Sequence, residues 1–161
     1  MQPFIRLDQT AVGRVDARGH LKVMYEQGDM VLKRSYSRAS VFRGMHWQRP
    51  PHAQTKLIRV VSGRILDFVV DMESTARALF YKELSPSEGW VMIGAHFAHG
   101  FYAMQDTEFE YLCHGAYNEV AEQSYSIDEF ISRRLGIVDA IYSAKDAAAT
   151  PLSVSVGLAD S

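Results

Sequence analysis

The strongest constraint on the fold is a series of short segments rich in Val, Ile, Phe and Tyr, with turn residues between them. β-Branched and aromatic side chains favour a pleated strand, and strands at this spacing are typical of an antiparallel sandwich or barrel. Ser62-Gly63, between two of these segments, predicts a tight hairpin. The predicted strands cover residues 55–61, 64–72, 78–84, 90–94, 97–104 and 108–114. The Gly-rich phosphate-binding motifs of α/β nucleotide folds do not occur in the sequence.

Near the C-terminus the pattern changes. Ser126-Ile127-Asp128-Glu129 has the spacing of a helix capping box, and Gly136 stands where a helix would end. We predict one short helix over residues 127–135 and a polar loop or tail over residues 143–152. No linker, repeat or low-complexity tract interrupts the sequence, so we expect a single domain over residues 1–161.

The composition excludes several classes of protein. Lys and Arg total 17 and Asp and Glu total 19, so charge-driven binding to nucleic acid or an acidic membrane is not expected. The single cysteine, Cys113, excludes an internal disulfide framework and a Cys-rich zinc site. No apolar run approaches the roughly 20 residues of a membrane span. The N-terminus also lacks the pattern of a secretory signal, and we therefore expect a cytoplasmic protein.

Three basic residues stand out in the strand pattern. Arg43 and His46 are three residues apart, which points them to opposite faces of a regular strand. Gly44 between them could host a bulge that re-aims one side chain. From these residues alone, an exposed arginine and a hydrogen-bonded core histidine are the simpler interpretation. Lys56 shares a face with apolar Ile58, so it either reaches solvent or lies inside the barrel as a cation that needs an anionic partner.

His99 and Tyr111 each share a predicted strand face with aromatic side chains. His99 lies on an aromatic-lined strand face, whereas His96 falls on the opposite face. Metal-binding cupins use a His-x-His pair with a following glutamate; His46-Trp47-Gln48 lacks this pattern, and we predict no metal site. The predicted inward face of residues 108–114 consists of Phe109, Tyr111 and Cys113, and the outward face carries Glu108 and Glu110.

Six strings, in order along most of the chain, carry a family resemblance. They are Arg43-Gly44-Met45-His46-Trp47-Gln48, Pro51-His52-Ala53-Gln54-Thr55-Lys56-Leu57-Ile58-Arg59-Val60, Asp67-Phe68-Val69-Val70-Asp71, Phe97-Ala98-His99-Gly100-Phe101, Glu108-Phe109-Glu110-Tyr111 and Ser143-Ala144-Lys145-Asp146. Together they resemble the dTDP-4-dehydrorhamnose 3,5-epimerase family. Any one string is weak, and their shared order makes the resemblance specific.

The resemblance implies an all-β fold, a cupin-type jelly-roll β-barrel with one or two short helices, mostly near the C-terminus. It also implies an isomerase, usually a homodimer, that works without a metal or other cofactor. Such an enzyme inverts C3 and/or C5 of a nucleotide-linked 4-keto-6-deoxy sugar, so a nucleotide-diphosphate sugar is the expected partner. Removing a proton beside a ketone requires a base and a stabilised enolate.

The same resemblance assigns roles to individual residues. His46 is the base, and Asp146 orients its ring and favours the imidazolium. Lys56 holds the charge that develops on the keto oxygen, and Tyr111 delivers a proton to the opposite face. Imidazole is basic near neutrality, while phenol keeps its proton until about pH 10. The residues that match substrate contacts are Arg18, Arg43, His99, Glu122 and Lys145.

Departures from the family pattern cluster where the family reads the nucleotide base. Its Arg-Gly-Phe is Arg18-Gly19-His20 here, its Gln-Asp-Asn-His is Val31-Leu32-Lys33-Arg34, and its Tyr-Tyr is Ala116-Tyr117. We therefore hypothesise that the nucleotide is not dTDP, or that the base is held differently. Three alternatives stay open: a ketoisomerase for the same substrate class, a metal-dependent cupin enzyme, and a non-catalytic sugar-nucleotide binding protein.

Overall fold

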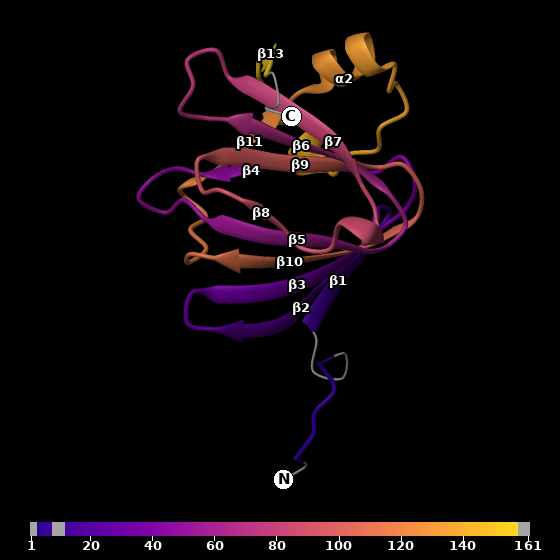
Figure 1. Cartoon of the computed structure of the whole chain (residues 1–161), viewed down its shortest axis with the longest axis vertical. Helices are drawn as coiled ribbons and strands as arrows, with labels where there is room; N and C mark the ends of the chain where they lie inside the picture. Colours follow the sequence, from indigo (N-terminus) through magenta and orange to yellow (C-terminus); the bar gives the residue numbers. More distant parts are fainter. Residues whose placement is uncertain (1–2, 8–11, 158–161) are drawn as a thin grey trace.

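Two curled β-sheets form the body of the computed structural model, which describes residues 3–7 and 12–157 (Figure 1). Within these residues, one sheet has the order β1 (Val12–Asp16), β2 (Gly19–Gln27), β3 (Met30–Ser37), β10 (Thr107–His114), β5 (Thr55–Ser62) and β8 (Val91–Ile93). The other has the order β12 (Thr150–Pro151), β11 (Glu122–Ser126), β4 (Phe42–Gln48), β9 (Phe97–Ala103), β6 (Ile65–Asp71), β7 (Ala78–Leu84) and β13 (Ser155–Val156). Short helices are η1 (Pro86–Glu88), α2 (Asp128–Leu135) and α3 (Ala144–Ala147). The predicted all-β jelly roll is confirmed.

The sheet that contains β4, β6 and β9 is covered on both faces, which explains why these strands are apolar at most positions. One face packs against α2 and the C-terminal segment through a cluster that includes Phe42, Phe68 and Ile131. The opposite face takes part in a second cluster inside the barrel: Ile58, Val60, Ile65, Leu84, Ile93, Phe101 and Phe109. Burying the first cluster holds α2 and the C-terminal segment against the sheet, and burying the second holds the two sheets together.

The predicted hairpin at Ser62-Gly63 is wrong. The strand before it, β5, pairs with β10 and β8, whereas the strand after it, β6, pairs with β7 and β9. The turn therefore carries the chain from one sheet to the other. Ile58 and Ile65, on either side of the turn, belong to the same core cluster and contribute to it from different sheets. A tight turn with a glycine fits both connections, and only the pairing of distant strands decides between them.

The other predicted strands agree with β7, β8, β9 and β10 to within about two residues. The predicted helix is confirmed as α2, with Gly136 in the left-handed conformation at its C-terminus (φ 70°). The capping box is not formed, because Ile127 is the N-cap residue and Ser126 belongs to β11. The predicted loop or tail over 143–152 is wrong at its start, where α3 forms one helical turn. No helix in the described part of the chain is long and apolar enough to cross a membrane.

The outward face of β10 contains a buried ion pair. Glu110 points away from Tyr111, as predicted, but it is only 4% exposed. Its carboxylate accepts hydrogen bonds from Arg34 Nε at 2.9 Å and Arg59 Nε at 2.7 Å. Burial by itself would raise the pKa of Glu110, but the two guanidinium groups lower it below its usual value. Three neighbouring strands, β3, β10 and β5, are thus tied together on the face opposite the cavity described next.

Candidate active site

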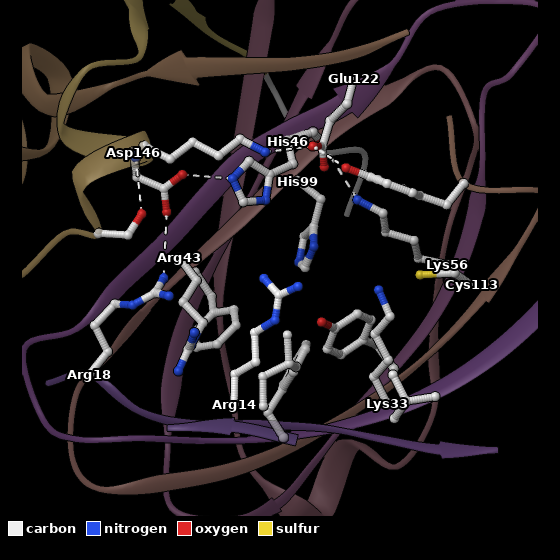
Figure 2. A pocket seen from close by; sticks show the side chains of 18 of the residues that line it. Arg14, Arg18, Lys33, Arg43, His46, Lys56, His99, Cys113, Glu122 and Asp146 are labelled. Atoms are coloured by element: carbon white, nitrogen blue, oxygen red, sulfur yellow. Dashed lines mark hydrogen bonds and ion pairs between the residues drawn. The ribbon is translucent and has the colours of Figure 1, made fainter. Parts of the chain in front are cut away.

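A cavity of about 730 Å³ lies between the two sheets, and side chains from both sheets line it (Figure 2). This volume is within the range of sites for small-molecule ligands and cofactors. Six Lys and Arg side chains line the cavity against two carboxylates, so the lining favours an anionic ligand. The cationic residues are Arg14, Arg18, Lys33, Arg43, Lys56 and Lys145.

Strand β4 brings Arg43 and His46 to the same cavity, although they are three residues apart. The register of β4 against β9 shifts between these two residues, which confirms the predicted irregularity. Gly44 lies at this shift with φ 116°, and a Cβ there would be 2.5 Å from the Cα of Gly100. Only glycine fits both the backbone conformation and the close approach of β9. The bulge is the local cause of the shared orientation.

His46 and Asp146 form a hydrogen-bonded pair across 100 residues of sequence. Nε2 of His46 lies 2.7 Å from Oδ1 of Asp146, so the tautomer with the proton on Nε2 leaves the Nδ1 lone pair free. Helix α3 holds the carboxylate, because the Ser143 hydroxyl accepts a hydrogen bond from the backbone N of Asp146 at 3.0 Å. Burial by itself would raise the pKa of Asp146, but the hydrogen bond and charge of His46 lower it below its usual value. The carboxylate is therefore ionised at neutral pH and holds the His46 ring through its Nε2.

Lys56 and Tyr111 reach the cavity from the other sheet. Lys56 points inward from β5, and burial lowers the pKa of its ammonium group. Its Nζ lies 3.5 Å from the backbone oxygen of His46. Tyr111 points inward from β10, and burial raises the pKa of its phenol. Within the described residues neither side chain has a carboxylate partner, so both are available to a ligand.

His99 on β9 is the direct cross-strand neighbour of His46. Its Nε2 lies 2.7 Å from Oδ1 of Asp67, and its ring lies nearly parallel to that of Phe109 with centroids 6.4 Å apart. The predicted aromatic-lined face is confirmed. Reasoning from the sequence missed Asp67 as the partner that holds His99. The available sequence signal was an aspartate inside an otherwise apolar strand, β6. In the structure Asp67 is only 6% exposed, and a carboxylate this deeply buried requires a hydrogen-bonding partner.

Arg43 and Arg18 lie close together at the cavity wall. Arg43 Nε donates to the Ser37 hydroxyl at 2.7 Å, and Arg18 Nη2 is 2.7 Å from Oδ2 of Asp16. Burial and the neighbouring Arg18 both lower the pKa of Arg43. Two guanidinium groups this close repel each other, and an anion between them would relieve the repulsion.

Glu122 and Lys145 bind each other in the structure. Oε2 of Glu122 lies 2.5 Å from Lys145 Nζ and accepts a hydrogen bond from the Tyr117 hydroxyl at 3.0 Å. Burial and the bond to Glu122 raise the pKa of Tyr117 to about 12. A ligand that contacts either Glu122 or Lys145 must compete with this pair. Tyr117 also lines the cavity. It is the tyrosine that remains where the family has Tyr-Tyr and this chain has Ala116-Tyr117.

All nine predicted site residues lie along this one cavity. They are Arg18, Arg43, His46, Lys56, His99, Tyr111, Glu122, Lys145 and Asp146. Their individual roles stay predictions. Within residues 3–7 and 12–157, no group of three or more His, Cys, Asp or Glu side chains is arranged to hold a metal ion.

Comparison with known families supplies the identity that geometry alone does not. Residues 14–153 match the family described as dTDP-4-dehydrorhamnose 3,5-epimerase, which is most of the chain. The chain belongs to this epimerase family. All nine cavity residues named above fall inside the matched region, so the match covers the site as well as the fold.

Individual members of the epimerase family are similar over different lengths. The dTDP-4-dehydrorhamnose 3,5-epimerase of Mycobacterium tuberculosis is 34% identical over 104 residues, which cover 56% of this chain and 47% of that protein. The enzyme of Shigella flexneri is 34% identical over 97 residues, which cover 55% of this chain and 52% of that protein. The chain thus spans about half the length of these relatives.

Solved structures of the epimerase family align over more of their length. The crystal structure of the enzyme from Sulfolobus tokodaii has a TM-score of 0.67 and 31% identity, and covers 86% of this chain and 85% of that chain. The enzyme from Bacillus anthracis, with TDP and PPi bound, has a TM-score of 0.69 and 26% identity, and covers 88% of this chain and 91% of that chain.

The positions that depart from the epimerase family pattern have different locations. The His20 ring stacks on Tyr36 with centroids 5.6 Å apart, and among the described residues that line the cavity His20 is absent. Lys33, by contrast, lines the cavity. Ala116 is exposed. Of these departures, Lys33 is the one that changes the charge of the cavity wall.

Proposed function

We propose that this chain is an isomerase that inverts C3 and/or C5 of a nucleotide-linked 4-keto-6-deoxy sugar. The observation that carries the proposal is the placement of a base and an acid on opposing sheets. His46, paired with Asp146, comes from β4, and Tyr111 comes from β10, with the cavity between them. Inversion at carbon requires removal of a proton from one face and delivery to the other. Family membership supports the same reaction class.

The first step uses the His46 side of the cavity. Nδ1 takes the proton from the carbon beside the ketone, and the electron pair of the broken C–H bond moves to the keto oxygen. Asp146 stabilises the imidazolium that results, because its carboxylate is hydrogen-bonded to the other ring nitrogen. Lys56 stabilises the enolate oxygen with its ammonium group. Burial strengthens this last interaction, since fewer water molecules screen the charge.

The second step uses the Tyr111 side. The enolate carbon takes the phenol proton on the opposite face, a C–H bond forms, and the negative charge passes from the enolate to the tyrosine oxygen. Solvent then restores both groups, with one proton leaving His46 and one returning to Tyr111. The proton balance is closed, and no group outside the chain and the substrate is required for the inversion.

Nucleotide binding is proposed for the cationic side of the cavity. The Bacillus anthracis relative holds TDP and PPi, and a Legionella pneumophila relative holds dTDP-4-keto-L-rhamnose. In this chain Arg18 and Arg43 are placed together where a diphosphate could bridge them. The identity of the nucleotide base stays open, because the strings that read this base in the family are replaced in this chain. Thermal-shift titrations with dTDP, GDP, CDP and UDP test this, and a clear preference for dTDP would reject a different base.

Three further properties remain predictions carried by family resemblance. We propose a homodimer, catalysis without a metal or other cofactor, and a cytoplasmic location. Size-exclusion chromatography with light scattering tests the first. Elemental analysis of the purified protein, with activity measured before and after chelation, tests the second.

Deuterium wash-in tests the proposed reaction directly. The protein is incubated in heavy water with 4-keto-6-deoxy sugars on several nucleotides, and label is followed at C3 and C5. His46→Ala should abolish wash-in, whereas Tyr111→Phe should keep part of it and lose inversion. Full activity in both variants would contradict the assigned roles, and a new carbonyl position in the product would indicate a ketoisomerase.

A further inference from the structure

Lys33 has no part in the reaction as described so far. It is the direct cross-strand partner of Tyr111 in the pairing of β3 with β10. Its Nζ lies 5.7 Å from the centroid of the Tyr111 ring, and both side chains line the cavity. Figure 2 shows Lys33 among the side chains that line it. Within the described residues, Lys33 makes no hydrogen bond or ion pair. An ammonium group without a counter-ion therefore lies beside the proposed proton donor.

The proton donor needs such a cation at one moment of the reaction. When Tyr111 gives up its proton it becomes a phenolate in a partly desolvated cavity, and burial disfavours that charged form. Arg18 and Arg43 also act on Tyr111, but Arg18 is paired with Asp16, and both guanidinium groups are proposed to bind the diphosphate of the substrate. Lys33 is the direct cross-strand neighbour of Tyr111, and among the described residues it has no counter-ion. The charged and titratable groups that face Tyr111 are Arg18, Lys33, Arg43, Lys56, Cys113 and Glu122.

We propose that Lys33 is a positioning residue for the proton-donor step: its ammonium stabilises the phenolate that forms when Tyr111 protonates the enolate carbon. The inference rests on the proposed epimerase function and deepens it. In this step the O–H bond of Tyr111 breaks, the C–H bond forms with the enolate electron pair, and the negative charge moves next to Lys33. The family's string has an amide at this position, so the device belongs to this chain rather than to the family pattern.

The geometry also sets how the effect divides between the two steps. Lys33 adjoins the Tyr111 ring, whereas His46 lies on β4 of the opposite sheet and Asp146 lies on α3. Loss of the ammonium should therefore slow protonation and leave proton abstraction nearly unchanged. For a cation 5.7 Å from the centre of the phenolate ring in a partly solvated site, its loss should slow inversion on the order of tenfold. The Lys33 ammonium favours the phenolate of Tyr111 and, in addition to burial, lowers the pKa of Lys56, so its removal also shifts the basic limb of the pH–rate profile to higher pH.

The test compares Lys33→Met, which keeps the length of the side chain, with Lys33→Arg, which keeps the charge. Inversion and non-inverting deuterium wash-in at the same carbon are measured in parallel across pH. We expect Lys33→Met to lose about tenfold in inversion, to keep wash-in within about twofold, and to show the shifted basic limb. Lys33→Arg should invert the substrate at close to the wild-type rate. Lys82→Met, on the exposed face of β7, is the matched control for removing a lysine.

The outcomes separate the two proposals. An unchanged ratio of inversion to wash-in in Lys33→Met would overturn the role of Lys33 and leave the epimerase function standing. No wash-in by the wild-type chain with any substrate would overturn the epimerase function, and the role of Lys33 with it. If Lys33→Met does not fold, Lys33→Asn gives the family's amide at the same position, and its ratio of inversion to wash-in decides between the same outcomes.

Discussion

Replacing Asp146 with asparagine isolates the contribution of the carboxylate to the base. Asp146 lies 2.7 Å from His46 Nε2 and its side chain is 1% exposed, while that of His46 is 33% exposed. Two opposite charges about 4 Å apart interact by about 4 kcal/mol at an effective dielectric constant near 20. Solvent at the His46 ring reduces this, and we take about 2–3 kcal/mol as the loss of imidazolium stabilisation. Asp146→Asn should therefore slow proton abstraction by roughly 30- to 150-fold.

Deuterium wash-in at saturating substrate measures this loss, and thermal unfolding of the variant checks that the fold is intact. The chain offers a matched control in Asp29→Asn, since Asp29 and His114 form another His–Asp pair, at 3.4 Å, with both side chains more than half exposed. That variant should behave as the wild type. An Asp146→Asn protein that exchanges within about threefold of the wild type would refute the reasoning that the buried carboxylate supports the base.

The lowered pKa of Asp146 makes the folding stability of the wild-type protein depend on pH. A carboxyl whose pKa is below its unfolded value adds stability above that unfolded value and loses it as the pH falls through the folded value. The stabilising contribution of Asp146 is therefore complete at neutral pH and disappears only in acid. Comparing urea unfolding of wild type and Asp146→Asn between neutral and acid pH checks this, and the difference in stability should shrink as the pH falls.

Three further predictions concern the scaffold of the site. Gly44→Ala should destabilise the fold by roughly 1–3 kcal/mol, because φ is 116° there and a Cβ would clash with β9; Gly28→Ala, where a Cβ meets nothing within 4 Å, should cost less in the same urea unfolding assay. Glu110→Gln should cost about 1–3 kcal/mol, since it removes the charge between two guanidinium groups, and its cost should vanish in acid as the lowered pKa of Glu110 is passed. Ser143→Ala should cost about 1 kcal/mol by removing the N-cap of α3. It should also slow wash-in, because that turn holds Asp146; unchanged wash-in would contradict this.

Local patterns predicted what local physics controls. The inward face of β10, the helix α2 with its left-handed Gly136, and the bulge at Gly44 each follow from a few neighbouring residues. The error at Ser62-Gly63 has the opposite origin. A short turn can join paired strands or pass between sheets, and the distant partners β10 and β9 decide which one occurs.

The site shows the same division. His46, Lys56, Tyr111 and Asp146 were selected by the resemblance to a family, since each taken alone has an ordinary structural explanation. Asp67 was not predicted as a site residue, because its partner His99 is 32 residues away in sequence and adjacent only across the β6–β9 pair. Lys33 was noted as a departure from the family, but its position beside Tyr111 depends on the β3–β10 register.

By itself the sequence determined the class of fold, because strand alternation and turn residues act between near neighbours. Its near-neutral composition gave no sign of a cationic cavity, since net charge averages over the whole surface. Only the tertiary structure decided which further charges meet, bringing His99 to Asp67 across the β6–β9 pair and Lys33 to Tyr111 across adjacent strands. Coulomb and hydrogen-bond energies depend on distance and burial, and strand pairing sets both.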